Sequence, residues 1–161
     1  MDIPDTAKFI EKPIDWGDAN KCIVKASRHY DVHPLVIKAV MLTENGKQGT
    51  VSENTNATYD LGPMQVNSSN IPFLKKEFPW LTFDNLANNT CANIVVATYF
   101  LRHKINGADT FWQGVGNYHS GTPKYHDRYM ARLVPIYRNL VKRSRKMLKR
   151  IRLRRKTYSI R

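Results

Sequence analysis

The stretch PLVIKAVMLTENG, residues 34–46, constrains the fold and the chemistry of this chain more than any other. Its apolar residues recur at helical spacing, and the same stripe reaches Glu44 one turn after Val40. Asn45 and Gly46 then indicate the end of the helix, because glycine readily adopts the left-handed conformation that ends helices. The pattern therefore predicts a core helix that ends in a carboxyl group on its apolar face.

The position of Glu44 has two interpretations. A carboxyl group held against apolar neighbours loses the hydration of its charged form, so its pKa rises and it can hold a proton near neutral pH, as a general acid must. The alternative is a glutamate in the last helical turn that faces solvent, which is the commoner arrangement for a single glutamate. Other motifs in the chain have to decide between the two.

The composition describes one folded domain with a basic end. A length of 161 residues, with 42% hydrophobic and 11% aromatic residues, is typical of a globular domain with a real core. Residues 142–161 contain eleven Lys or Arg and no acidic residue, so they carry +11 of the formal net charge of +13. The high isoelectric point therefore describes this tail, and it indicates no nucleic-acid function for the rest of the chain.

Neither the apolar runs nor the cysteines determine the compartment. No apolar run is long enough to span a bilayer, and residues 1–18 contain no stretch resembling a signal peptide. Removal of a signal, export by another route and an internal location all stay open. Cys22 and Cys91 lie on two separate predicted helices, either as free buried thiols, as in most cytosolic proteins, or as a disulfide in an exported one.

The periodicity along the chain predicts a mainly α fold with almost no strand signal. We expect an N-terminal arm at 1–18, a helical domain at 19–141 and a polybasic tail at 142–161. Asp18 is the expected N-cap of the first helix, and residues 47–60 are expected to form a loop or a short irregular ribbon. The expected helices cover residues 18–30, 34–44, a short segment from 67 or 68 to about 78, a brief turn at 84–86, 89–106 and 110–118. A last helix is expected to start at Thr122-Pro123, to bury Tyr125 or Tyr129, and to continue into the tail.

Three motifs together resemble a known family. Glu44 closes a helix, LGPMQVN follows at 61–67, and GVGNYHSG follows at 114–121. In this order and spacing they resemble the soluble-lytic-transglycosylase type of lysozyme-like domain, in particular the small peptidoglycan-cleaving enzymes of conjugation and type IV secretion systems. The resemblance covers about residues 20–140. It implies a lysozyme-like helical domain with at most a minimal β ribbon, here followed by a basic C-terminal helical tail.

The chain also departs from the family pattern, which reads E-S, then G-L-M-Q, then A-Y-N. The chain keeps five residues of this pattern: Glu44, Gly62, Met64, Gln65 and Tyr118. The departures are Asn45 in place of Ser, Pro63 in place of Leu, and Asn117-Tyr118-His119 in place of A-Y-N. His119 is the departure with the clearest chemical consequence, because a histidine titrates near neutral pH and changes the pH response of a site.

The resemblance implies a role for each matching residue. Glu44 would protonate the oxygen between N-acetylmuramic acid and N-acetylglucosamine, and would then act as a base while the muramic acid 6-hydroxyl closes a 1,6-anhydro ring. Tyr118 would orient Glu44 by a hydrogen bond, or would be a core aromatic residue. Met64 and Gln65 would line the sugar groove, or would form a packed turn. Asn45 and His119 are further candidates for contacts with Glu44 or the substrate, although Asn45 fits a simple helix end equally well.

Other acids, metals and cofactors have no expected catalytic role. Asp60 is interpreted as a turn-forming residue and is left out of the catalytic set. The five His and two Cys form no close cluster with metal-ligand spacing, so we expect neither a metal ion nor an organic cofactor.

The resemblance also implies a setting: a monomer in the bacterial periplasm or cell envelope that cuts peptidoglycan glycan strands for assembly of a secretion or conjugation apparatus, with components of that apparatus as partners. For the tail, the hypotheses are contact with an anionic cell-wall polymer, a lipid surface, an acidic partner or nucleic acid, against a simple solvated helix end. The rival functions are a hydrolytic lysozyme, a non-catalytic cell-wall-binding assembly protein and a nucleic-acid-binding domain.

Overall fold

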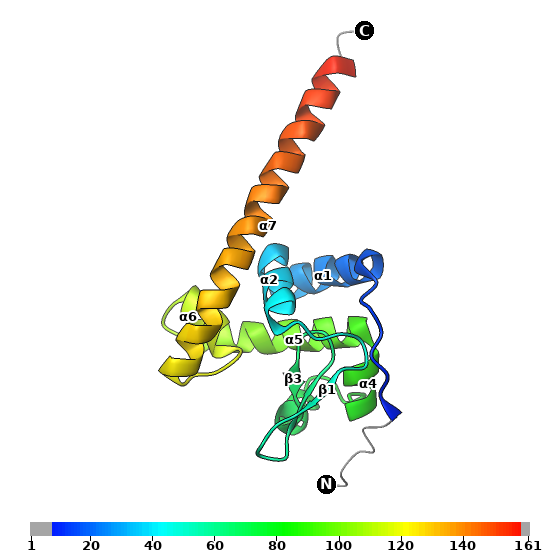
Figure 1. Ribbon diagram of the computed structural model, residues 1–161, viewed down its shortest axis with the longest axis vertical. Coiled ribbons are helices and arrows are strands. Elements are labelled where there is room, and N and C mark those ends of the chain that lie inside the picture. Colours follow the sequence, from blue (N-terminus) through cyan, green and yellow to red (C-terminus); the bar gives the residue numbers. More distant parts are fainter. Residues whose placement is uncertain (1–7, 159–161) are drawn as a thin grey trace.

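The computed structural model describes residues 8–158 and the side chains of residues 8–155, and it confirms a mainly helical fold with a small sheet (Figure 1). In chain order the elements are α1 (Trp16–Tyr30), α2 (Pro34–Glu44), β1 (Val51–Glu53), β2 (Tyr59–Leu61), β3 (Val66–Asn67), the 3-10 helix η2 (Ser68–Asn70), α3 (Ile71–Leu74), α4 (Phe83–Asn88), α5 (Thr90–Asn106), α6 (Phe111–Asn117) and α7 (Pro123–Tyr158). Within the described residues, no helix has the length and apolar character needed to cross a membrane.

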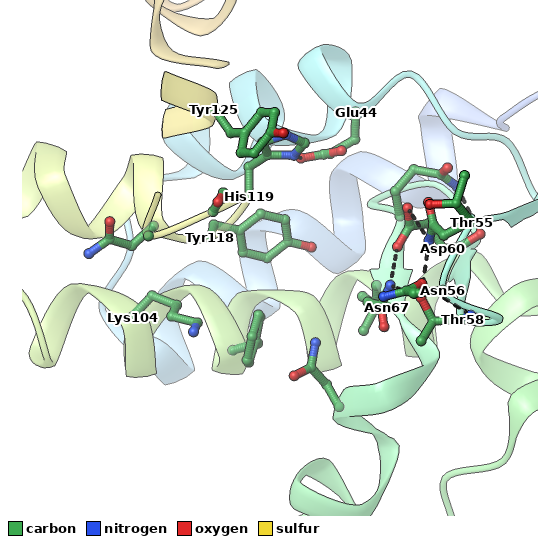
Figure 2. A pocket seen from close by; sticks show the side chains of 18 residues that line it. Glu44, Thr55, Asn56, Thr58, Asp60, Asn67, Lys104, Tyr118, His119 and Tyr125 are labelled. Carbon is green, nitrogen blue, oxygen red and sulfur yellow. Dashed lines mark hydrogen bonds and ion pairs between the residues drawn. The ribbon is translucent and has the colours of Figure 1, made fainter. Parts of the chain in front are cut away.

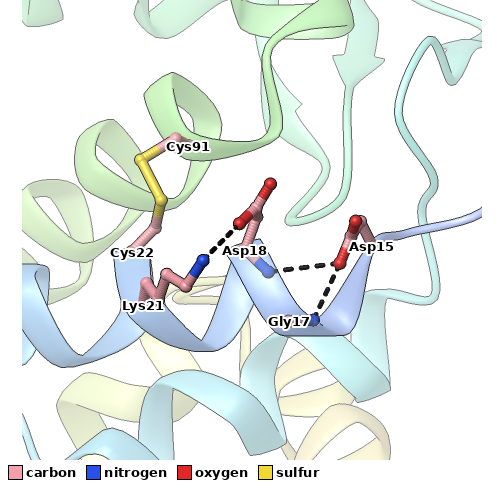
Figure 3. A network of polar contacts seen from close by, with 6 residues as sticks. All are labelled: Asp15, Gly17, Asp18, Lys21, Cys22 and Cys91. Carbon is pink, nitrogen blue, oxygen red and sulfur yellow. Dashed lines mark hydrogen bonds and ion pairs between the residues drawn. A yellow bond between two sulfur atoms is a disulfide. The ribbon is translucent and has the colours of Figure 1, made fainter.

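Helix α1 begins two residues before the predicted boundary at residue 18. The Asp15 side chain accepts hydrogen bonds from the backbone N–H groups of Gly17 and Asp18, so Asp15 is the N-cap and the predicted cap at Asp18 is wrong (Figure 3). Asp18 instead lies in the first turn, where its carboxylate pairs with Lys21 at 2.8 Å. A carboxylate in the first turn also interacts favourably with the positive end of the helix dipole.

Helix α5 is the centre of the fold, and a disulfide fastens α1 to it. Cys22 of α1 and Cys91 of α5 are bonded, with their Cα atoms 5.5 Å apart, which decides between the two sequence interpretations of the cysteines (Figure 3). The buried face of α5 includes Ile94, Val96 and Leu101, each with 0% exposure. The helix therefore has neighbours on several sides, and α1, α4 and α6 all pack against it (Figure 1).

Of the two structures predicted for the polar stretch after α2, a loop or a short β ribbon, the structure contains the ribbon. Strands β1, β2 and β3 pair antiparallel in that order. In this register Ser52 lies opposite Asp60, and Asp60 lies opposite Asn67. Asp60 is therefore a strand residue, and its interpretation as a turn-forming residue is wrong.

Helix α7 packs its first half on the body and extends beyond it (Figure 1). Its contacts with the body are made mainly with α2 and α6. Tyr129 and Leu133 are fully buried there, whereas Tyr125 is 50% exposed, so Tyr129 is the inward-facing tyrosine of the two that were predicted. The helix continues through Pro135 and runs unbroken into the basic residues after 142.

Candidate active site

A cleft of about 610 Å³ lies where the end of α2, the small sheet, α5 and the α6–α7 connection meet (Figure 2). Glu44 and His119 lie on one side of it, and Asp60 lies across from them among neutral polar side chains. The cleft therefore combines titratable groups with amides and hydroxyls, which suits a polar, uncharged ligand such as a sugar chain.

The end of helix α2 places Glu44 at the cleft. Asn45 adopts the left-handed conformation, with φ of 57°, and its N–H donates to the Met41 carbonyl. Gly46 follows in close contact with the backbone of Gly62, where a Cβ would overlap the Gly62 carbonyl oxygen. The predicted helix end is thus confirmed, with Asn45 rather than Gly46 in the left-handed conformation. The Asn45 side chain is exposed and is not part of the cleft lining.

The Glu44 carboxyl group is buried and incompletely hydrogen-bonded. Its side chain is 10% exposed, and its buried Oε1 atom has no hydrogen-bond partner. Burial raises the pKa of Glu44 to about 7, with a smaller contribution from the negative charge of Asp60, while Tyr129 and Arg132 act in the opposite direction. A group with this pKa holds a proton in about half of the molecules at neutral pH, so Glu44 can serve both as an acid and as a base.

Tyr129 is the neighbour of Glu44 that sequence reasoning missed as a site residue. Its hydroxyl faces the carboxyl group and favours its charged form, although neither this hydroxyl nor Glu44 Oε1 has a hydrogen bond of good geometry. Burial raises the pKa of Tyr129 strongly, so its hydroxyl stays protonated and is available as a donor. In the sequence, Tyr129 appears only as one inward position of a helix. The clue to its role in the site is that a buried tyrosine hydroxyl needs a polar partner.

His119 lies beside both residues. Its ring stacks on Tyr129 with centroids 4.7 Å apart and an interplanar angle of 4°, and its Nδ1 is 4.0 Å from Glu44 Oε1. Burial and the positive charge of Arg132 lower the pKa of His119, so the ring is neutral at neutral pH. In the neutral form His119 supports Tyr129 by packing and adds no positive charge beside Glu44.

Tyr118 is buried at the cleft but does not make the predicted bond. Its hydroxyl donates to the Met64 carbonyl oxygen at 2.7 Å, and no hydrogen bond to Glu44 is present. Burial, with the nearby negative charges of Glu44 and Asp60, raises the pKa of Tyr118, so the hydroxyl remains a donor. Tyr118 thereby fixes the loop that precedes β3.

Met64 and Gln65 face in different directions. The Met64 side chain has 0% exposure and lies in the core, so it does not contact the cleft, contrary to the expectation that it would lie against a sugar ring. Gln65 does line the cleft. Its backbone has φ of 50°, and its side-chain amide donates to the Gly62 carbonyl and accepts from Ser52.

Asn93 of α5 holds this loop from beneath, and sequence reasoning missed it. Its buried side chain accepts from the Met64 N–H at 2.8 Å and donates to the carbonyls of Leu61 at 2.8 Å and Leu86 at 2.9 Å. A polar side chain with all its partners satisfied inside a core fixes one local conformation. The clue in the sequence is that this asparagine lies directly beside the apolar stripe of the helix predicted at 89–106.

Asp60 is held in the cleft as an acceptor. Its two carboxylate oxygens accept from the side-chain amides of Asn54 at 3.1 Å and Asn67 at 2.8 Å (Figure 2). Other amides and hydroxyls of this wall belong to Thr55, Asn56, Thr58 and Asn70. Among residues 8–158, no three His, Cys, Asp or Glu side chains lie close enough to hold a metal ion together.

Comparisons with known proteins give a matching family model and several similar proteins. The family model described as "Transglycosylase SLT domain" matches residues 21–131. The chain is 28% identical over 132 residues to a "Peptidoglycan-binding-like protein" of Escherichia coli O157:H7, a match covering 76% of this chain and 79% of that protein. It is also 28% identical over 130 residues to "Invasion protein IagB" of Salmonella typhimurium strain SL1344, covering 78% of each chain.

Proposed function

Because the chain belongs to the transglycosylase SLT domain family, we propose that it is a peptidoglycan lytic transglycosylase with Glu44 as its catalytic acid and base. The observation that carries this proposal is the buried Glu44 carboxyl group at the cleft, with an unbonded oxygen and a pKa of about 7. A carboxyl group with these properties can give a proton to a bound glycosidic oxygen and later take one back.

In the first step, Glu44 donates its proton to the oxygen between N-acetylmuramic acid and N-acetylglucosamine. The bond from this oxygen to the anomeric carbon breaks, and the N-acetyl carbonyl oxygen of the muramic acid bonds to that carbon in its place. The negative charge of Asp60 favours the positive charge that develops on the sugar. The Tyr129 hydroxyl, which faces Glu44, favours the carboxylate that remains.

In the second step, the Glu44 carboxylate takes the proton of the muramic acid 6-hydroxyl. The 6-oxygen bonds to the anomeric carbon, the N-acetyl oxygen leaves it, and a 1,6-anhydro ring closes. Glu44 regains its proton and no water is consumed. The neutral wall formed by the sheet, including Asn54 and Asn67, offers donors and acceptors for the hydroxyl and acetamido groups of the glycan.

Hydrolysis is the second candidate, and Asp60 is the observation that favours it. A carboxylate that faces an acidic glutamate across a cleft can assist attack by water or bond to the anomeric carbon, as in a muramidase. Asp60 lies in the same cleft as Glu44, and its charge raises the pKa of Glu44. The products differ: hydrolysis leaves a reducing end, whereas the transglycosylase leaves an anhydro end that is lighter by one water.

The proposed setting is the cell envelope, with local opening of the wall for a secretion or conjugation apparatus. The relation to an invasion protein supports this setting. The disulfide between Cys22 and Cys91 also supports it, because such bonds persist in oxidising compartments such as the bacterial periplasm.

The test is the release of soluble muropeptides from purified sacculi. Wild-type protein is expected to release them, and Glu44→Gln is expected to lower the rate by about a thousandfold, within the range for loss of a general acid. Glu53→Gln, on the exposed end of β1, is the matched control and should keep wild-type activity. A wild-type protein that binds sacculi without releasing products would contradict the proposal and support a non-catalytic binding protein.

A further inference from the structure

Helix α7 carries an apolar stripe beyond the point where it leaves the body. Leu133 is buried and Tyr137 and Leu140 pack against the core. Met147 and Ile151 continue the stripe two heptads after Leu133 and Tyr137, and so lie on the same side of the helix. They are 60% and 41% exposed. A face that is covered over the first half of the helix is thus open to solvent over the second.

The basic residues nearest to this stripe are arginines. The basic residues within a quarter turn of it are all arginines, whereas two lysines lie on the opposite face of the helix. The flanking arginines are Arg143, Arg150, Arg154 and Arg155, the opposite lysines are Lys142 and Lys149, and the residues between the two groups are Arg145, Lys146 and Arg152. All nine residues are exposed, and residues 142–155 contain no acidic residue. Arginine, unlike lysine, binds a carboxylate through two parallel hydrogen bonds, so the edges of the stripe suit carboxylate partners.

The position of the body limits what can cover the stripe. The Tyr137 ring contacts Trp112 of α6, with centroids 5.0 Å apart, so the stripe faces the side of α7 on which the body lies. The free half of α7 extends beyond the body (Figure 1). A flat bilayer that lies parallel to α7 on the side of the stripe would meet the body first. A single helix, about 10 Å wide, can lie along α7 beside the body.

Other occupants fit the stripe less well. A second copy of the chain would bring its own arginines against these, with no acidic residue in 142–155 to offset their repulsion. Nucleic acid would pair with the arginines but leave Met147 and Ile151 uncovered, and Tyr158 is the one aromatic residue among residues 142–161 that could stack on a base. An acidic partner helix satisfies both the charge and the apolar surface.

We propose that residues 140–155 of α7 dock an acidic amphipathic helix of another protein. Met147 and Ile151 are the apolar anchors of this interface, and the four flanking arginines pair with carboxylates of the partner helix. The interface is separate from the cleft and does not depend on the proposed catalytic activity.

The test uses the full-length protein and a designed 21-residue helical peptide with leucine at the a and d positions and glutamate at e and g. A matched peptide carries glutamine in place of glutamate. With ¹³C-labelled methionine methyl groups, the acidic peptide should shift the Met147 signal and leave the buried Met41 and Met64 signals in place. The neutral peptide should bind at least about tenfold more weakly.

Matched variants assign the contacts. Met147→Ser with Ile151→Ser should weaken peptide binding by more than about tenfold, because both anchors lose their apolar contact. Arg143→Gln with Arg150→Gln should weaken it by about tenfold, and Lys142→Gln with Lys149→Gln, which removes the same charge, by less than about threefold. These side chains are exposed, so thermal unfolding should stay at the wild-type value and exclude misfolding as the cause.

Four results would overturn the proposal. One is no saturable binding of the acidic peptide, and another is equal weakening by the arginine and lysine pairs, which would indicate general charge attraction. The third is a Met147 signal that stays in place when the peptide binds. The fourth is tighter binding to phosphatidylglycerol vesicles or duplex DNA than to the peptide, with the same dependence on Met147 and Ile151.

Discussion

Replacing Glu44 by glutamine is expected to stabilise the folded protein at alkaline pH while abolishing its activity. The folded protein holds the Glu44 pKa at about 7, against an ordinary value of 4.5, because burial disfavours the charged form. As the pH rises above 4.5, the unfolded chain loses this proton more readily than the folded protein, so folding stability falls. The loss is complete once the pH exceeds about 7, where Glu44 is charged in both states.

The size of the effect follows from the difference between the two pKa values. A rise from 4.5 to about 7 corresponds to about 3 kcal/mol, since one pKa unit is worth about 1.4 kcal/mol. Little of this is screened, because the side chain is only 10% exposed. Glutamine is neutral in both states and resembles the protonated acid in shape. Glu44→Gln should therefore gain about 3 kcal/mol over wild type at pH 8 and almost nothing at pH 4.

The assay is denaturant unfolding of both proteins at the two pH values, with ΔG of unfolding compared at each. Comparing the two proteins at the same pH cancels the titration of all groups that they share. Glu53→Gln controls for the removal of one negative charge from a basic protein. If Glu44→Gln were no more stable than wild type at pH 8, the carboxyl group would not be held in an unfavourable charged form, and the reasoning about its acid–base role would fail.

Three further predictions concern the residues around Glu44 and the framework that holds them. Asn93→Ala should lower the free energy of unfolding by about 2 to 4 kcal/mol, measured by denaturant unfolding, because it leaves buried backbone groups of the Met64 loop unpaired. Cys22→Ser with Cys91→Ser should cost about 4 kcal/mol in the chain-entropy model for a bridge spanning 69 positions; a loss below about 1 kcal/mol would exclude this contribution. Asp60→Asn should reduce muropeptide release less than Glu44→Gln does and move the pH optimum downward, because Asp60 raises the pKa of Glu44; a loss as large as that of Glu44→Gln would indicate a second catalytic carboxylate.

The helices and the position of Glu44 could be predicted from the sequence because each depends on local signals. The apolar spacing of residues 34–44 predicts a buried helix, and the Asn-Gly pair after Glu44 predicts where it ends. The structure confirms the buried helix and its end. The N-cap of α1 was harder to place. Asp15 and Asp18 are equally good caps by residue type, and the choice depends on where the chain turns into the helix.

The partners of Glu44 could not be predicted, because they depend on contacts between distant segments. Tyr118 matched a family motif, yet its hydroxyl reaches the Met64 carbonyl, while Tyr129, from the next helix, faces the carboxyl group. Asp60 ends a polar stretch with no convincing strand period, and pairing with β3 places it opposite Asn67 in the cleft. The spacing of residues along the chain predicts which face of a helix or strand a residue occupies. Tertiary packing determines which residue of the neighbouring element it contacts.

The most direct test of the central claim is mass spectrometry of the muropeptides that wild-type protein releases from purified sacculi. A single acid and base at Glu44, with closure by the muramic acid 6-hydroxyl, predicts products that end in 1,6-anhydro-N-acetylmuramic acid and are absent with Glu44→Gln. Products with reducing ends, heavier by one water, would contradict the account and identify the protein as a hydrolase.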